Sequence, residues 1–80
     1  MSGGYFDYAQ FHITKIVDDI ERVINAHGED YSPQVLQRFR DAIVVLKRAE
    51  TYAHRIDWLL SGDDGEESFL ERLEEELKEI

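Results

Sequence analysis

The chain has 80 residues and a formal net charge of −9, with 42% hydrophobic and 11% aromatic residues. A chain this short forms one domain at most and buries only about 60–65% of its unfolded surface, so self-association would add stability. The hydrophobic content argues against a disordered chain, and the absence of cysteine excludes disulfides and thiolate metal sites. No basic segment with an apolar run opens the chain, and no run approaches about 18 apolar residues. We therefore expect a cytoplasmic protein with neither a signal peptide nor a membrane span.

The negative charge is concentrated at the C-terminal end. Residues 57–80 hold ten acidic and two basic side chains, a net of −8, whereas residues 1–56 hold eight acidic and seven basic ones, a net of −1. Phosphate groups need cationic partners, so direct nonspecific binding to nucleic acid is disfavoured. We expect the partner to be a basic protein surface or another copy of this chain.

The first predicted helix covers residues 7–27. Asp7 can cap it, with Gln10 three residues later as the capping-box partner, and Gly28 is a typical stop. Apolar residues with a helical period form one stripe. This stripe comprises Ala9, Ile13, Ile16, Val17, Ile20, Val23 and Ile24.

The second predicted helix covers residues 32–61. Ser32 caps it, Pro33 occupies the first helical position, and Gly62 follows its end. Its main apolar stripe comprises Val35, Phe39, Ala42, Ile43, Leu46, Ala49, Ala53 and Leu60. A second stripe at seven-residue spacing comprises Val45, Tyr52 and Leu59.

The third predicted helix covers residues 64–80, with Asp64 as its cap and Glu67 completing a capping box. Both connections are short, so successive helices should run antiparallel. The sequence therefore predicts an all-α domain over residues 1–80, with three helices arranged on a long central one. That central helix is apolar over more than half its circumference, and its neighbours are too short to cover it. A homo-oligomer, most simply a dimer, would bury the remainder.

Glu50, His54 and Asp57 lie on one side of the second helix, and two of them are carboxylates in its apolar sector. An unpaired buried charge is costly, so the first interpretation is ion pairing within the structure. The candidate cations are Lys15, Arg22 and Arg55. A metal site is not expected, because the chain holds no Glu-x-x-His pair of the kind that di-iron bundles use.

A second interpretation of the same residues is a ligand pocket between subunits. Its candidate residues are Tyr5, Tyr8, Glu50, His54 and Asp57. The protein would then be a homo-oligomer that sequesters a small molecule such as a signalling nucleotide. Arginines from neighbouring chains would have to converge there to bind phosphate.

Nothing in the sequence has the pattern of a catalytic site. No serine stands beside a base, and the acids around Gly65 do not fit a calcium-binding loop. We therefore expect a non-enzymatic protein that needs no cofactor.

Two segments resemble a family of small bacteriophage and prophage proteins. They are MSGGYFDY at residues 1–8 and RIDWLLSGDDGEESF at residues 55–69. The resemblance spans most of the chain but carries over no assigned activity and no site residues. It implies a setting: phage accessory proteins of this size often neutralise a host function, including CRISPR and nucleotide-signalling immunity.

The sequence therefore favours a phage-type inhibitor whose acidic C-terminal helix engages a basic, nucleic-acid-binding surface of a host protein by imitating phosphate. A structural helical assembly protein is a further alternative. The predicted partner-binding residues are Trp58, Asp63, Asp64, Glu66, Glu67, Glu71, Glu74, Glu75, Glu76 and Glu79. Capping and helix-dipole chemistry already account for the first four acids, so the later five are the unexplained excess.

Overall fold

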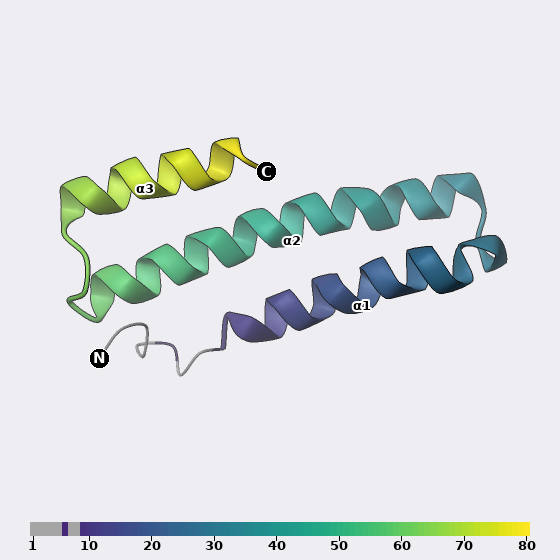
Figure 1. Cartoon of the computed structure of the whole chain (residues 1–80), viewed down its shortest axis with the longest axis horizontal. Helices are drawn as coiled ribbons and strands as arrows, with labels where there is room; N and C mark the ends of the chain where they lie inside the picture. Colours follow the sequence, from purple (N-terminus) through teal and green to yellow (C-terminus); the bar gives the residue numbers. More distant parts are fainter. Residues whose placement is uncertain (1–5, 7–8) are drawn as a thin grey trace.

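Three α-helices make up most of the described chain, which in this computed structural model comprises Phe6 and residues 9–80. They are α1 (Phe11–His27), α2 (Pro33–Leu60) and α3 (Glu66–Lys78), and a 3₁₀ turn, η1 (Gly28–Asp30), joins α1 to α2. Each helix runs antiparallel to the one before it, with α2 in the middle (Figure 1). The prediction of an all-α chain with three antiparallel helices on a long central one is confirmed.

The N-terminus of α2 is formed as the sequence predicts. Ser32 has extended backbone angles, φ −69° and ψ 157°, and its Oγ accepts a hydrogen bond from the Val35 N–H at 3.3 Å. Pro33 occupies the first helical position, where an N–H would have no partner within the helix. Local chemistry alone accounts for this helix start.

The C-terminus of α2 closes on a glycine in the left-handed region. Gly62 has φ +81°, and its N–H donates to the Leu59 carbonyl at 3.2 Å. The Asp63 N–H donates to the Trp58 carbonyl at 3.0 Å, which completes a Schellman motif. This turn reverses the chain and starts α3 back along α2.

The start of α1 differs from the prediction. The helix begins at Phe11 rather than at Asp7, which itself lies outside the described residues. Gln10 precedes the helix, and its side chain makes no capping bond. Its amide Nε2 instead donates to Asp57 Oδ2 on α2 at 3.0 Å. The Gln10 side chain, which the sequence pattern assigns to a capping box, therefore makes a tertiary hydrogen bond instead.

The start of α3 also differs, because Gly65 rather than Asp64 is the residue before the helix. The Gly65 N–H donates to Ser68 Oγ at 3.2 Å. Ser68 Oγ in turn donates to Asp64 Oδ1 at 2.5 Å. Ser68 thus has the capping role predicted for Glu67, and the Asp64 carboxylate is left to bind neighbouring groups.

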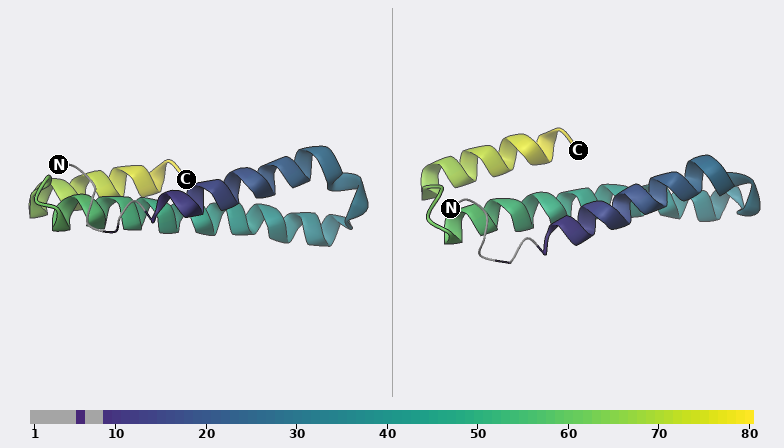
Figure 2. Two further views of the ribbon diagram at one scale, coloured as in Figure 1. Left: turned by 90° about the horizontal axis from the view of Figure 1, so that it is seen from below. Right: turned by 60° about the horizontal axis from the view of Figure 1, so that its bottom comes forward.

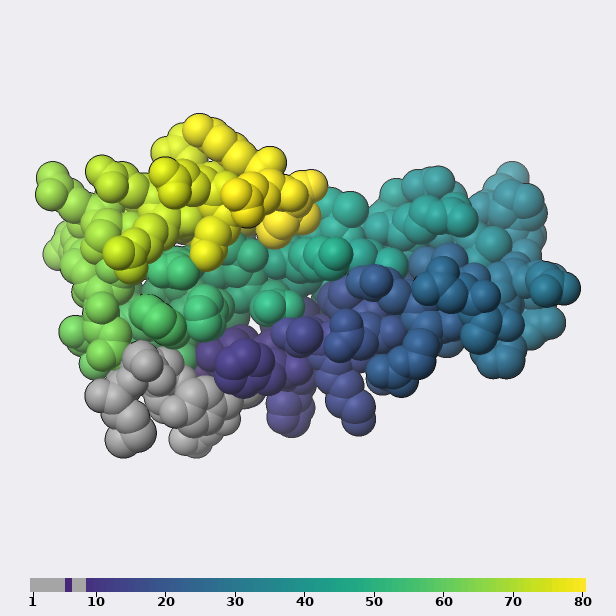
Figure 3. Space-filling model, viewed as in Figure 1, coloured from purple at the N-terminus to yellow at the C-terminus, as the bar shows by residue number. Residues whose placement is uncertain are grey.

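The three helices form a thin layer rather than a closed bundle. The backbone extends 46 × 24 × 13 Å, so the molecule is about half as thick as it is wide. Figure 2 shows the layer from two further sides, and Figure 3 shows α1 and α3 on the two sides of α2. Val17 is the only buried hydrophobic side chain of the described chain. Within the same residues, no helix is both long enough and apolar enough to cross a membrane.

Candidate functional site

Arg55 links the C-terminal half of α2 to α3 through hydrogen bonds. Its side chain is only 11% exposed. The Nε donates to Glu76 Oε1 at 2.9 Å, and Nη2 donates to Oε2 at 3.0 Å. The guanidinium carbon lies 5.4 Å from the centroid of the Trp58 ring, within the range of a cation–π interaction. A planar guanidinium held by two parallel hydrogen bonds fixes the orientation of α3 as well as its position.

Asp64 belongs to the same cluster. Its side chain is 3% exposed, and its oxygens lie 3.9 Å from Arg55 Nη1 and 3.8 Å from Arg72 Nη1. The carboxylate also accepts hydrogen bonds from the Gly65 N–H and from Ser68. Asp64 and Glu76 were both predicted to face a partner, and both carboxylates are instead engaged within the chain.

The other predicted acids lie on the surface. These exposed residues are Asp63, Glu66, Glu67, Glu71, Glu74, Glu75 and Glu79. No salt bridge joins any of them to a cation within the described part of the chain. Four of them lie roughly 100–180° around α3 from Glu76, which faces α2. We call these four residues, Glu67, Glu71, Glu74 and Glu75, the acidic ridge.

The acidic ridge is unfavourable for the helix that carries it. Glu67, Glu71 and Glu75 follow one another at four-residue spacing, and each like-charge pair at this spacing costs a helix about 0.2–0.5 kcal/mol. The two cations of α3 are Arg72 and Lys78, and Arg72 lies beside Asp64. The helix dipole favours Glu67 in the first turn, but helix formation does not account for Glu71, Glu74 and Glu75.

Trp58 is half-buried at the C-terminal end of α2. Its ring centroid is 5.3 Å from that of His54, and Arg55 lies over its face. The predicted partner-binding tryptophan thus packs against two side chains of its own helix. It supports the Arg55 cluster, which positions α3.

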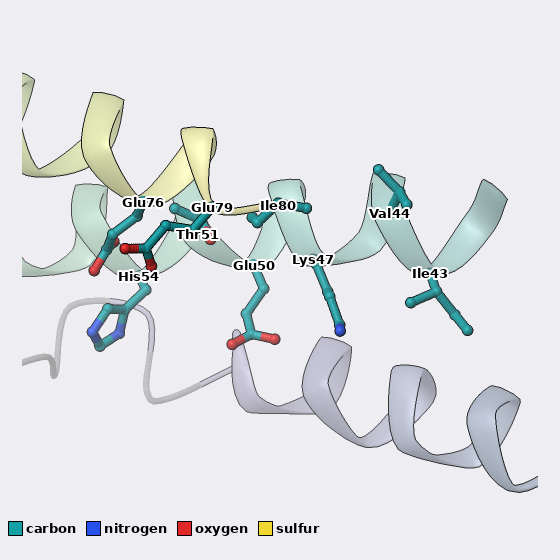
Figure 4. Close-up of a pocket in the computed structure, with 9 residues that line it drawn as sticks. All are labelled: Ile43, Val44, Lys47, Glu50, Thr51, His54, Glu76, Glu79 and Ile80. Atoms are coloured by element: carbon teal, nitrogen blue, oxygen red, sulfur yellow. The ribbon is translucent and has the colours of Figure 1, made fainter. Parts of the chain in front are cut away.

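The three residues predicted to share a site on α2 are separated by the fold. Glu50 and His54 line a groove of about 500 Å³ on one face of the layer, whereas Asp57 does not line it. Figure 4 shows this groove, which extends along α2 to the C-terminal end of α3. The complete lining is Ile43, Val44, Lys47, Glu50, Thr51, His54, Glu76, Glu79 and Ile80. Tyr5 and Tyr8 of the predicted pocket lie outside the described residues.

Asp57 is fully buried, with 0% exposure. Its Oδ1 accepts the Phe6 N–H at 3.1 Å, and its Oδ2 accepts the Gln10 amide at 3.0 Å. The predicted ion pair with Lys15, Arg22 or Arg55 is absent among the described residues. Arg22 instead pairs with Asp19 at 3.1 Å, and Arg55 pairs with Glu76 at 2.9 Å.

The charge of the groove does not suit a phosphate ligand. Lys47 is the only Lys or Arg among its lining residues, against the carboxylates of Glu50, Glu76 and Glu79. The Lys47 Nζ also lies 3.9 Å from Glu21 Oε1 on α1. Within the part of the chain that the structure describes, no three His, Asp or Glu side chains are grouped so as to hold a metal ion.

Comparison of the chain with protein-family models, with curated proteins and with solved structures finds no match. The structure itself therefore has to identify the functional surface. Sequence patterns did not reveal the roles of Gln10 and Arg55. The one local signal was the three-residue spacing of Arg55 and Trp58, which places the two side chains on one side of α2.

Proposed function

We propose that this protein is a non-enzymatic binding protein whose acidic ridge on α3 engages a basic surface of a partner protein. The supporting observation is that the ridge carboxylates are exposed to solvent and also lower the stability of their own helix. The ridge carboxylates are exposed and without a salt bridge to any described cation, although their spacing destabilises the helix. A surface that weakens its own helix requires a reason other than folding.

The way α3 is attached to α2 supports the same proposal. The bidentate Arg55–Glu76 pair and the neighbouring Asp64 fix the side of α3 that faces α2. The opposite side is then presented with little freedom, which lowers the entropy lost on binding. Carboxylates in a row on a rigid helix can pair with arginines and lysines that otherwise contact phosphate.

The setting of this activity comes from the family resemblance of residues 1–8 and 55–69. In a phage-type inhibitor, the partner would be a host protein whose nucleic-acid-binding surface is basic. The acidic ridge would occupy that surface in place of nucleic acid. Counter-defence, including anti-CRISPR action, is the class of function that fits such competition.

The test is affinity capture from bacterial lysate with two charge-matched variants. Glu71→Gln/Glu74→Gln removes two ridge charges, and Asp18→Asn/Glu29→Gln removes two exposed acids elsewhere. We expect the ridge variant to lose its captured partner and the control variant to retain it. Binding to the identified partner should weaken steeply with salt, and short duplex DNA should compete for it.

Three outcomes would count against the proposal. They are equal capture by both variants, binding that does not change with salt, and a captured partner that duplex DNA does not displace. The first would place the binding surface elsewhere, and the second would exclude an electrostatic interface. The third would remove the nucleic-acid-mimicking mechanism while retaining a role for the ridge.

A further inference from the structure

A row of apolar residues on α2 has the spacing of a coiled-coil contact. The residues are Ala42, Val45, Ala49, Tyr52, Ile56 and Leu59, and the intervals between them alternate between three and four. This is the spacing by which one helix packs along a partner helix. We call these six residues the α2 seam. Val45 and Tyr52 are 63% and 42% exposed, so α1 and α3 leave the middle of the seam uncovered, whereas the residues at its two ends are half-buried.

The α2 seam lies on the face of the layer opposite the groove. Ile43, Lys47, Glu50 and His54 line the groove, and each is followed two positions later by a seam residue. Two positions correspond to about 200° around a helix. By the same geometry, Leu70 on α3 lies about half a turn from Glu79, which lines the groove. Leu70 is 63% exposed and extends the apolar surface onto α3.

The exposed surface of the chain is also larger than that expected for a compact monomer of its mass. The chain exposes 5852 Å², whereas the scaling for monomers of 9.4 kDa gives about 5000 Å². The excess of about 800 Å² is close to the share of one partner in a standard interface. Domains are normally built from two packed layers around a core, and this chain supplies one.

We propose that a second copy of this chain packs against the α2 seam, with the two α2 helices antiparallel. A twofold axis makes the seam its own complement, so a single surface serves both copies. The seam contains no charged residue, and most of the net charge lies at the end of the chain, in residues 57–80. In the antiparallel orientation small seam residues face large ones, Ala42 with Leu59 and Ala49 with Tyr52, whereas a parallel pair would place each residue opposite its own copy.

The seam also defines the register of this dimer. In an antiparallel pair, residues of the two helices face each other in reverse order. Centring the pair between Ala49 and Tyr52 brings Ala42 opposite Leu59 of the second copy and Val45 opposite Ile56. Every seam residue then has an apolar counterpart. The two copies of Ala42 are separated by about 25 Å along the axis.

The first test compares two adjacent exposed valines. Val45 lies in the seam, and Val44, which is 46% exposed, lies on the groove side. In sedimentation equilibrium across a dilution series, the natural chain should have twice its mass of 9.4 kDa. Val45→Glu should raise the dimer Kd by about a hundredfold or more, because it buries two unpaired charges. Val44→Glu has the same composition and charge and should remain dimeric.

The second test uses cross-linking and does not depend on a disruptive variant. The chain has no cysteine, so Ala42→Cys and Leu59→Cys each introduce a single thiol. Under mild oxidation, a mixture of the two variants should form a disulfide between them, whereas neither should cross-link to itself, because a disulfide needs Cα atoms within about 7 Å. Self-cross-linking of both variants would overturn the antiparallel orientation. A monomeric natural chain, or equal effects of Val44→Glu and Val45→Glu, would overturn the dimer.

The dimer and the proposed function can fail separately. The seam variants leave every residue of the acidic ridge in place, and the ridge variants leave the seam in place. If Glu71→Gln/Glu74→Gln loses its captured partner but keeps the mass of the dimer, the result bears on the acidic ridge alone. Loss of the dimer in Val45→Glu tests only the seam.

Discussion

Arg55 of α2 and Glu76 of α3 share two hydrogen bonds, at 2.9 and 3.0 Å, across the interface of the two helices. The Arg55 side chain is 11% exposed, and that of Glu76 is 39% exposed. The pair therefore sits between a buried ion pair, whose disruption is costly, and a surface ion pair, which contributes little. We therefore expect the loss of this pair to have an intermediate effect on the free energy of unfolding.

Replacing Arg55 with alanine should lower the free energy of unfolding by about 1–2 kcal/mol. The change leaves the Glu76 carboxylate without its partner and removes the cation from the face of Trp58. Urea denaturation followed by circular dichroism measures the effect. Arg38→Ala is the matched control, because Arg38 is 85% exposed and pairs with Asp41 at 3.5 Å. Equal losses in the two variants would show that Arg55 does not anchor α3.

A double-mutant cycle should detect the bond between Gln10 and Asp57. Asp57→Asn places a donor where the Gln10 amide or the Phe6 N–H requires an acceptor, so we expect a loss of about 1–3 kcal/mol. Gln10→Ala removes one of the same bonds. The two losses should not add, with a coupling energy of about 1 kcal/mol, because the residues share an interaction. Fully additive losses would mean that the bond contributes nothing to stability.

Gly62 should tolerate alanine poorly for a reason confined to the backbone. A Cβ at this position would meet no atom within 4 Å, but φ is +81°, where a side chain costs about 1–2 kcal/mol. Gly62→Ala should lower the free energy of unfolding by that amount. Gly28→Ala is the control, because Gly28 has φ −61° and its Cβ would make ordinary contact with Leu36 at 3.9 Å. The control should be neutral or slightly stabilising, and a loss as large as that of Gly62→Ala would refute the backbone explanation.

Glu71→Gln should stabilise the fold while weakening partner binding. Glu71 has a like charge four residues away on each side, at Glu67 and Glu75. Removing both repulsions should raise the free energy of unfolding by about 0.5 kcal/mol at low salt. The gain should disappear at high salt, because screening removes the repulsion in the natural chain as well. A destabilised variant would indicate that the acidic ridge contributes to the fold.

The sequence by itself determined the three helices and both ends of α2. Ser32 and Pro33 start α2 through bonds to the next few residues, and Gly62 ends it because only its backbone adopts the required φ easily. These interactions span a few positions along the chain. A periodic pattern of apolar residues then sufficed to predict the helices, and the short connections predicted their antiparallel order.

Only the tertiary structure decided which charged residues remain free. Asp64 and Glu76 have the same chemistry as the acids of the ridge, yet they face Arg55, whereas the ridge faces away from α2. Asp57 binds Gln10, which is 47 positions away, rather than a cation. Such pairings depend on how each helix is rotated about its axis against its neighbour, and packing along the whole interface sets that rotation. A local pattern could therefore supply the candidate acids but not distinguish those that hold the fold together from those that face outward.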